Sequence, residues 1–426
     1  MLNRTIAPDL KQPEQITITD PAKIILPNGI PLFLFNQGTQ DVCKIEFLFS
    51  GGSLHESQPL IAAATNELID EGTSQKTSAQ IAEIFDYYGA YLQTECTADW
   101  ASVSLFTLNK FLDQTMDLLQ EVITDPVFPE KELHTFVTQG KQRLTVSLEK
   151  VDYLARRNFS SSVFGNHAYG FSKSLIDYDG LNSQLLSDFY KKQYQKSVKA
   201  IIVAGRLNAD QEKKLIIKLG SMDINFADPD FTMLPIPTPS TKEIMLVEKH
   251  DAVQNAIRIG RSLFNRTHPD YPKLTVLNTI LGGYFGSRLM SNIREDKGYT
   301  YGIGSGIASM QQSGYFYIAT EVGADVCKAA VKEIYSEIKK LQNEVVPEDE
   351  LNLVRNYLYG SFQRSIDGPF ALADRFKSIM TYGLHADYFH RYLSIVKTIN
   401  AEELKTLAQK YLDLNMLSEI TAGKKF

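Results

Sequence analysis

Histidines are the first residues to examine for chemistry, because imidazole is the commonest metal ligand in proteins and a frequent general base. Two histidines that bind one zinc ion from a single helix lie about one helical turn apart. His385 and His390 are five positions apart, and neither H-E-x-x-H nor H-x-x-E-H occurs in the chain. Residue types alone therefore point to no zinc hydrolase site. The other histidines are isolated and are expected in loops or in the core: His55, His134, His167, His250 and His268.

One segment, residues 281–302, does combine residues that could act on a substrate. Its glycines do not have the spacing of a phosphate-binding loop, and the chain also lacks the G-x-S-x-G turn of serine hydrolases. The segment contains Arg294 and Tyr301, seven residues apart. A guanidinium and a phenol can both donate hydrogen bonds to a peptide carbonyl and stabilise its developing oxyanion. A surface arginine and a strand aromatic remain the alternative interpretation.

The elements that must position these residues alternate between strands and helices. Residues 23–35 predict a hairpin around Asn28-Gly29, and residues 42–49 predict a strand with Lys44 and Glu46 on a polar face. A helix is predicted over 60–71 with Gly72 as its end, and Ser78 is the predicted cap of the next helix. Paired hairpins without a regular βαβ order predict an α+β fold. Further elements are expected as strands at 91–98 and 100–108, a helix at 112–123, and a long helix from Pro129-Glu130.

The C-terminal part of the chain repeats the N-terminal part at a constant offset of 218 residues. A single offset held over so long a stretch predicts a duplicated domain. We expect two homologous α/β-sandwich-like halves, residues 1–226 and 242–426, that face each other as a clamshell. A proline-rich linker, 227–241, joins them. The matching pairs are Pro129 and Pro347, Leu133 and Leu351, Asn182 and Asn400, Leu186 and Leu404, Lys192 and Lys410, and Gly205 and Gly423.

Composition excludes several classes of function. The chain has 44 basic and 50 acidic residues and a net charge of −6, so we expect no nucleic-acid partner and no anionic membrane surface. The three cysteines, Cys43, Cys96 and Cys327, form no disulfide or zinc pattern. No apolar leader or membrane-spanning stretch is evident, which favours the cytoplasm and leaves the periplasm open.

The motifs as a set resemble those of the pitrilysin- and insulinase-like peptidases, the inverzincins, which include the mitochondrial processing peptidase. Those proteins carry a similar glycine pair, Ser-Arg-Leu, Ile-Arg-Glu and tyrosine, as residues 281–302 do here. The similarity extends through nearly the whole chain and agrees with the duplication. It rests further on Pro27-Asn28-Gly29, Gly51-Gly52 through Glu56, Asp70-Glu71-Gly72-Thr73, Tyr88-Gly89-Ala90, Phe128-Pro129-Glu130 and Asn166-His167-Ala168-Tyr169-Gly170.

The chain departs from this family at the zinc motif. Active members have H-x-x-E-H at the places that match residues 63–67 here. Both zinc histidines are replaced, by Ala63 and Glu67, and the catalytic glutamate by Asn66, which cannot act as a general base. The third ligand of the family, a glutamate, falls near Gln142-Arg143. We therefore expect no metal or other cofactor in this chain and no zinc-peptidase activity from it alone.

The resemblance also implies a role for the retained pair. In the family an arginine and a tyrosine at the spacing of Arg294 and Tyr301 contact bound peptide opposite the zinc. Members of this size often work in pairs, and we expect a non-zinc subunit whose sister supplies the zinc site. A heterodimer is expected and a homodimer stays open. An edge strand near Gly314–Thr320 is predicted to pair with an extended peptide.

Two alternatives remain at this point. The chain could be a structural or peptide-binding protein of the same fold, since core subunits of the respiratory cytochrome complex use this fold as a scaffold. A stand-alone peptidase with a rebuilt metal site is the third possibility, and the histidine spacing makes it the weakest.

Overall fold

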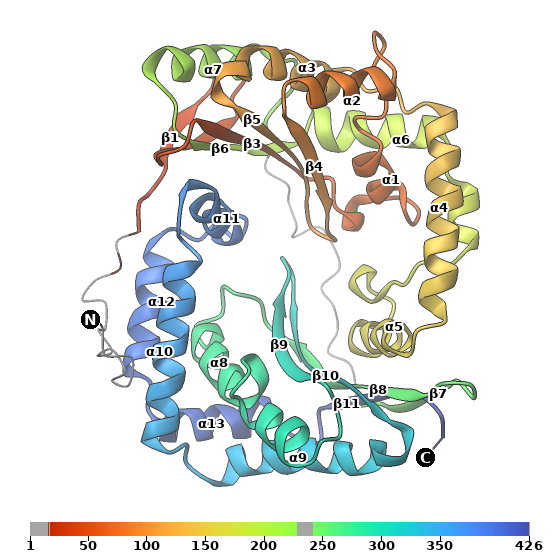
Figure 1. Cartoon of the computed structure of the whole chain (residues 1–426), viewed down its shortest axis with the longest axis vertical. Coiled ribbons are helices and arrows are strands. Elements are labelled where there is room, and N and C mark those ends of the chain that lie inside the picture. Colours follow the sequence, from red (N-terminus) through yellow and green to blue (C-terminus); the bar gives the residue numbers. More distant parts are fainter. Residues whose placement is uncertain (1–15, 17, 228–241, 426) are drawn as a thin grey trace, which may run out of the picture.

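The computed structural model describes residues 16, 18–227 and 242–425 (Figure 1). Its N-terminal sheet has the strand order β1-β2-β6-β3-β5-β4. Only β2 and β6 run parallel, and every other neighbouring pair is antiparallel. The strands are β1 (Ala22–Ile25), β2 (Pro31–Asn36), β3 (Val42–Phe49), β4 (Tyr91–Cys96), β5 (Ala101–Leu108) and β6 (Val198–Gly205).

Helices cover the outer face of this sheet and enclose the first hydrophobic core. The helix that carries residues 63–67 ends at Glu67, earlier than predicted, because Leu68 leaves helical geometry and Gly72 pairs with Thr77. The next helix is capped by Thr77, not by Ser78, through a capping box with Gln80. The helices are α1 (Ile61–Glu67), α2 (Ser78–Tyr87), α3 (Leu112–Thr124), α4 (Glu130–Leu148), α6 (Ser183–Tyr190) and α7 (Ala209–Ser221).

The C-terminal sheet has the order β7-β11-β8-β10-β9. A strand does form at Gly314–Thr320, as part of β10, but the prediction that it lies at the sheet edge is wrong. β10 pairs with both β8 and β9 and so lies inside the sheet. The free edge on that side belongs to β9. The elements are β7 (Ile244–Glu248), β8 (Gln254–Leu263), β9 (Ile303–Ser309), β10 (Gly314–Gly323), β11 (Ser418–Gly423), α8 (Tyr271–Asn278), α9 (Cys327–Asn343), α10 (Glu348–Arg364), α12 (Asp387–Thr398) and α13 (Ala401–Tyr411).

The structure confirms the duplication in the predicted register. Asn182 and Asn400 each cap the helix that precedes the last strand of a sheet. Gly205 and Gly423 each end that strand with φ near +140°, a conformation that favours glycine. A Cβ atom at Gly205 would lie 2.2 Å from the Val42 carbonyl oxygen, and one at Gly423 would lie 2.1 Å from Asn255 Oδ1.

The two halves face each other and exchange one helix each (Figure 1). Helix α5 (Val151–Phe164) follows α4 of the N-terminal half but packs on β8 and β11 of the other sheet. Its counterpart α11 (Pro369–Met380) follows α10 and packs on β2 and β6. The inner face of each sheet is thus covered by a helix from the opposite half.

This exchange covers the polar face of β3, which the sequence alone did not show. Lys44 and Glu46 do lie on the polar face of β3, but both are buried, Glu46 with only 1% of its surface exposed. Lys377 of α11 lies over them and pairs with Glu46 at 2.7 Å.

The predicted linker falls on residues that the structure does not describe, except for residue 227, so the boundaries between halves stay a prediction. None of the described helices combines the length and apolarity needed to cross a bilayer.

Candidate functional site

Two short π-helical segments position the residues of the Gly-rich motif. The first, η7 (Thr279–Gly283), packs so tightly on β9 that a Cβ atom at Gly282 would lie 2.7 Å from the Ser305 backbone nitrogen. The second, η8 (Met290–Asp296), carries Arg294. Arg288 just before η8 donates two hydrogen bonds to Glu350 of α10, at 2.9 and 2.8 Å. This bidentate pair fixes the segment to the C-terminal half.

The structure places Arg294 and Tyr301 close together. The Arg294 guanidinium lies 4.6 Å from the ring centre of Phe285 and 5.5 Å from that of Tyr301. Both rings are unusually open to solvent, Tyr301 at 93% and Phe285 at 62% exposure. Within the described chain, Arg294 has no carboxylate within ion-pair distance. Its guanidinium therefore lies beside two exposed aromatic rings and has no charged partner there.

Phe285 was missed from the sequence. The only signal was its place within the Gly-Gly-Tyr-Phe-Gly run.

Thr300 fixes the backbone beside Tyr301. Its hydroxyl donates to the Glu321 carbonyl at 2.7 Å and accepts from the Gly302 amide at 3.0 Å. Tyr301 lies two residues before β9, so the exposed phenol stands at the start of the free sheet edge. Because the backbone beside Tyr301 is already fixed, binding at the phenol would have to order only the side chain.

The residues that replace the zinc motif lie on α1 in the N-terminal half. Asn66 is buried at 2% exposure, and its amide donates to the Ser102 carbonyl at 3.3 Å. It thus ties α1 to β5 and has a structural role. Ala63 is half-buried and offers no ligand atom.

Two of the vacated ligand positions bind each other. Arg143 Nη2 of α4 lies 3.2 Å from Glu67 Oε1 of α1, and both side chains are more than half exposed. The positive charge of Arg143, next to the single remaining carboxylate of Glu67, would repel a divalent cation. Among residues 16, 18–227 and 242–425, no three His, Cys, Asp or Glu side chains are grouped to hold a metal ion. The side chains present therefore do not fit a zinc ion.

A carboxyl group near α1 has an unusual environment that the sequence did not reveal. Burial raises the pKa of Glu56 to about 7, against the hydrogen bond that its Oε2 accepts from the Ala62 amide at 3.0 Å. Burial likewise raises the pKa of Asp70 to about 6, with the neighbouring Glu71 carboxylate as a smaller cause. Neither carboxyl belongs to a group of three possible metal ligands within the described chain.

Comparison with known families agrees with this geometry. Residues 33–173 match the family described as Insulinase (Peptidase family M16), and residues 180–358 match the Peptidase M16 inactive domain. The chain belongs to peptidase family M16. Together the two matches cover well over half of the chain, which confirms the resemblance drawn from the motifs.

Relatives in the M16 family carry names of both active and inactive proteins. The "Non-peptidase homolog YmxG" of Helicobacter pylori is 24% identical over 88% of this chain and 87% of its own. The "Uncharacterized zinc protease YmxG" of Bacillus subtilis is 24% identical over 90% of this chain and 93% of its own. A solved structure of a peptidase M16 inactive domain from Pseudomonas fluorescens has a TM-score of 0.86 and 21% identity. It covers 96% of this chain and 99% of its own, and it shows the same fold. This chain is a non-catalytic M16-like protein.

Proposed function

We propose that this chain is the zinc-lacking subunit of a two-subunit M16 peptidase, in which a sister chain with an intact H-x-x-E-H motif supplies the metal. In this role the chain binds and orients peptide substrate and performs no hydrolysis itself. The partner is expected to be a homologue in a heterodimer, and a homodimer is the alternative assembly.

The observation that carries the proposal is the solvent-facing group of Arg294, Phe285 and Tyr301. An arginine without a carboxylate partner in the described chain keeps its donors for a ligand, and a guanidinium held between rings is already oriented. Large aromatic side chains at such exposure are typical of binding surfaces. A purely structural role would not require this exposure.

The neighbouring strand supplies a second element for peptide binding. Strand β9 is at the edge of the C-terminal sheet, and its residues 303–309 pair on one side only, with β10. An extended peptide can add to such an edge through backbone hydrogen bonds. A peptide on β9 would begin beside Tyr301, so its carbonyl groups would lie within reach of the arginine and the phenol.

The test begins with an affinity pull-down of the chain from its native cells and an assay of the recovered complex on a quenched peptide. A sister protein with H-x-x-E-H and chelator-sensitive cleavage supports the proposal. In the recombinant complex, Arg294→Ala should then lower kcat/KM at least about tenfold, the effect of losing one charge-assisted hydrogen bond, with assembly unchanged on gel filtration.

The matched control is Arg391→Ala, which removes an exposed arginine of α12 that pairs with Asp387 one turn away. This variant should keep the wild-type rate. Equal rates for Arg294→Ala and wild type would contradict the substrate-binding role. Recovery of the chain without a peptidase partner would favour the scaffold alternative.

A further inference from the structure

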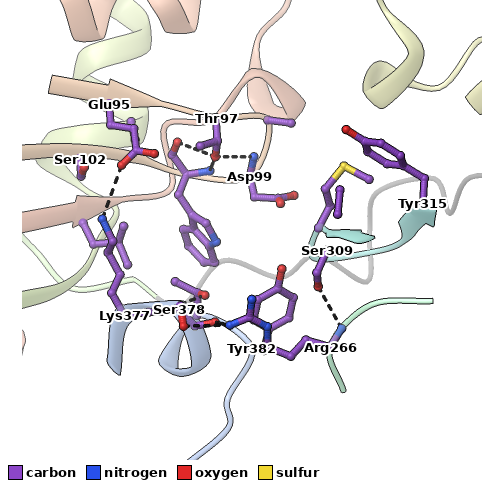
Figure 2. Close-up of a pocket in the computed structure, with 17 residues that line it drawn as sticks. Glu95, Thr97, Asp99, Ser102, Arg266, Ser309, Tyr315, Lys377, Ser378 and Tyr382 are labelled. Atoms are coloured by element: carbon purple, nitrogen blue, oxygen red, sulfur yellow. Dashed lines mark hydrogen bonds and ion pairs between the residues drawn. The ribbon is translucent and has the colours of Figure 1, made fainter. Parts of the chain in front are cut away.

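A cavity of about 450 Å³ lies where the two halves meet. Its walls come from the β4–β5 turn, the end of β9, the last turn of α11 and the loop after β8 (Figure 2). Leu48 and Ser102 line it from the inner face of the N-terminal sheet, whereas Phe47, Phe49 and Val103 point to the opposite face and pack with α1. The cavity is therefore separated from the degenerate zinc motif by the sheet, and neither Arg294 nor Tyr301 lines it.

One wall carries a positive charge without a counter-ion. Arg266 Nη1 donates to the Ser378 hydroxyl at 2.8 Å and to the Ser378 carbonyl. Its guanidinium lies against the rings of Tyr271 and Tyr382, and Figure 2 shows the side chain passing beside Tyr382 to reach Ser378. The Nε atom is buried without a hydrogen-bond partner. No carboxylate of the described chain lies within ion-pair distance of Arg266, so its positive charge has no counter-ion there and favours an anion.

A second arginine strengthens this positive potential. Arg375, one turn before Ser378 on α11, also has a buried Nε without a partner and lies against the rings of Phe362 and Phe389. Burial lowers its pKa, and the nearby charge of Arg266 lowers it further. Two such cations with no carboxylate beside them in the described chain make the site favourable for a carboxylate ligand.

The β4–β5 turn places an acid on the cavity. Asp99 is buried and accepts hydrogen bonds from the Tyr169 hydroxyl at 2.6 Å and from the Gln311 amide at 3.1 Å. These bonds fix the carboxyl group and leave lone pairs for another donor. Within the described chain no lysine or arginine lies within ion-pair distance of Asp99, and the titratable group that acts on its charge is His167.

The other two charges on the cavity neutralise each other. Lys377 lies 2.7 Å from Glu46 and 3.5 Å from Glu95. Arg266 is thus the cation of the cavity without a carboxylate beside it, and Asp99 is the acid without a lysine or arginine beside it. Apolar side chains line the cavity between the charged groups, among them Leu48, Trp100 and Met310.

We propose that this cavity binds a small apolar zwitterion, an amino acid or short peptide whose carboxylate lies on Arg266 and whose ammonium group lies on Asp99. The apolar side chains of the ligand would pack on Leu48, Trp100 and Met310. The volume is typical of small-molecule pockets and holds a dipeptide. The proposal does not depend on the proposed subunit role, because the site is within this chain and uses other residues.

The chain itself supplies the probe for a test. Trp100 is the single tryptophan of the sequence and lines the cavity, so its emission reports on occupancy. The full chain is titrated with leucyl-leucine and with leucine up to about 10 mM, where even a millimolar site is populated. We expect a saturable change in the emission of Trp100 and a rise in the Tm of the chain. The ligand that binds more tightly shows whether the site prefers a dipeptide or an amino acid.

Two modified ligands test the charges. The C-terminal amide and the N-acetyl derivative of leucyl-leucine should each bind at least about tenfold more weakly, because each loses one charge-assisted contact. Arg266→Gln should abolish the preference for the acid over the amide, and Asp99→Asn should abolish the preference for the free amine. Ala308→Leu, which fills the cavity without changing its charge, should weaken all ligands.

Arg391→Gln is the matched control and should bind as wild type does. No saturable response of wild type to either zwitterion overturns the proposal, as does equal binding of acid and amide. If Arg266→Gln or Asp99→Asn fails to fold, the proposal is still tested in two ways. One is the comparison of the acid, amide and acetylated ligands on wild type, and the other is the Ala308→Leu variant.

Discussion

At the scale of single residues, the ion pair between Glu67 and Arg143 explains why this chain cannot recover zinc by one substitution. Glu67 alone is a possible oxygen ligand, but the guanidinium of Arg143 neutralises it at 3.2 Å. The side-chain amide of Asn66 already donates a hydrogen bond to the Ser102 carbonyl, and the side chain of Ala63 has no atom that can bind a metal. Because the ligand atoms and the general base are lost together, a histidine at position 63 would find no partners for a tetrahedral site.

The residue scale also gives a prediction for Glu56. Burial raises the pKa of this carboxyl from 4.5 to about 7, so the folded chain holds the proton more tightly than the unfolded chain does. The stability that this proton contributes is complete below about pH 4.5 and is lost as the pH rises through about 7. Glu56→Gln cannot ionise and keeps an acceptor for the Ala62 amide. We expect it to be about 2 kcal/mol more stable than wild type at pH 8, by urea unfolding.

The comparison of pH values is the informative part of this experiment. The variant and wild type should differ little at pH 5 and diverge toward pH 8. Glu83→Gln, on the exposed face of α2, is the control and should change the unfolding free energy by less than about 0.5 kcal/mol. A Glu56→Gln variant that is less stable than wild type at pH 8 would contradict the buried, protonated state.

At the scale of elements, local signals in the sequence were sufficient for some features and not for others. The turn at Asn28-Gly29 and the amphipathic helix at 112–123 depend on neighbours in sequence, and the structure confirms them. The alternation in β3 correctly placed Lys44 and Glu46 on one face. It could not show that α11, some 330 residues later, covers this face, since a buried ion pair and a solvated one give the same pattern. The prediction of the edge strand in the C-terminal sheet was wrong for a similar reason, because strand order is set by pairing between distant segments.

The contact between α11 and β3 gives a prediction at this scale. Burial alone would raise the pKa of Glu46, but Lys377 and Lys44 hold it below its usual value. Lys377→Ala leaves this buried carboxylate with Lys44 alone, at 3.0 Å. We expect a loss of about 3 kcal/mol in the free energy of unfolding at pH 7, measured with urea. The loss should begin to shrink as the pH falls and the variant protonates Glu46, whose pKa is higher without Lys377. It should be smallest once the pH is below the lowered pKa of Glu46 in wild type.

A lysine with an exposed partner serves as the control for α11. Lys214→Ala removes a pair with Asp210 on the surface of α7 and should shift the urea midpoint little. Equal effects of the two substitutions would contradict the view that Lys377 stabilises α11 on the N-terminal sheet.

At the scale of the whole molecule, the exchange of α5 and α11 joins halves that the sequence presents as separate repeats. The constant offset of 218 residues was enough to predict the duplication, because equivalent residues have the same structural role in both copies, as the helix caps Asn182 and Asn400 do. It could not predict the exchange, the cavity or the contacts between the halves, because an offset along the chain does not show which distant segments pack together. Two of these contacts hold α5 and the turn before it on the C-terminal half: Arg258 pairs with Asp152 of α5 at 2.9 Å, and Lys249 pairs with Glu149 of the turn at 2.7 Å.

The exchange predicts that neither half is stable alone. Without α11, the N-terminal half would expose an apolar surface formed by Phe35, Ile202 and Ala204, which now packs against Leu372 and Ala373. We expect residues 1–226 expressed alone to aggregate, because an uncovered apolar sheet face favours association. Co-expression with residues 242–426 should restore a soluble complex that unfolds in one transition by calorimetry. The same complex with Lys377→Ala should melt at a lower temperature. A cooperative unfolding transition from residues 1–226 alone would show instead that each half folds independently and that α11 only docks on a finished sheet.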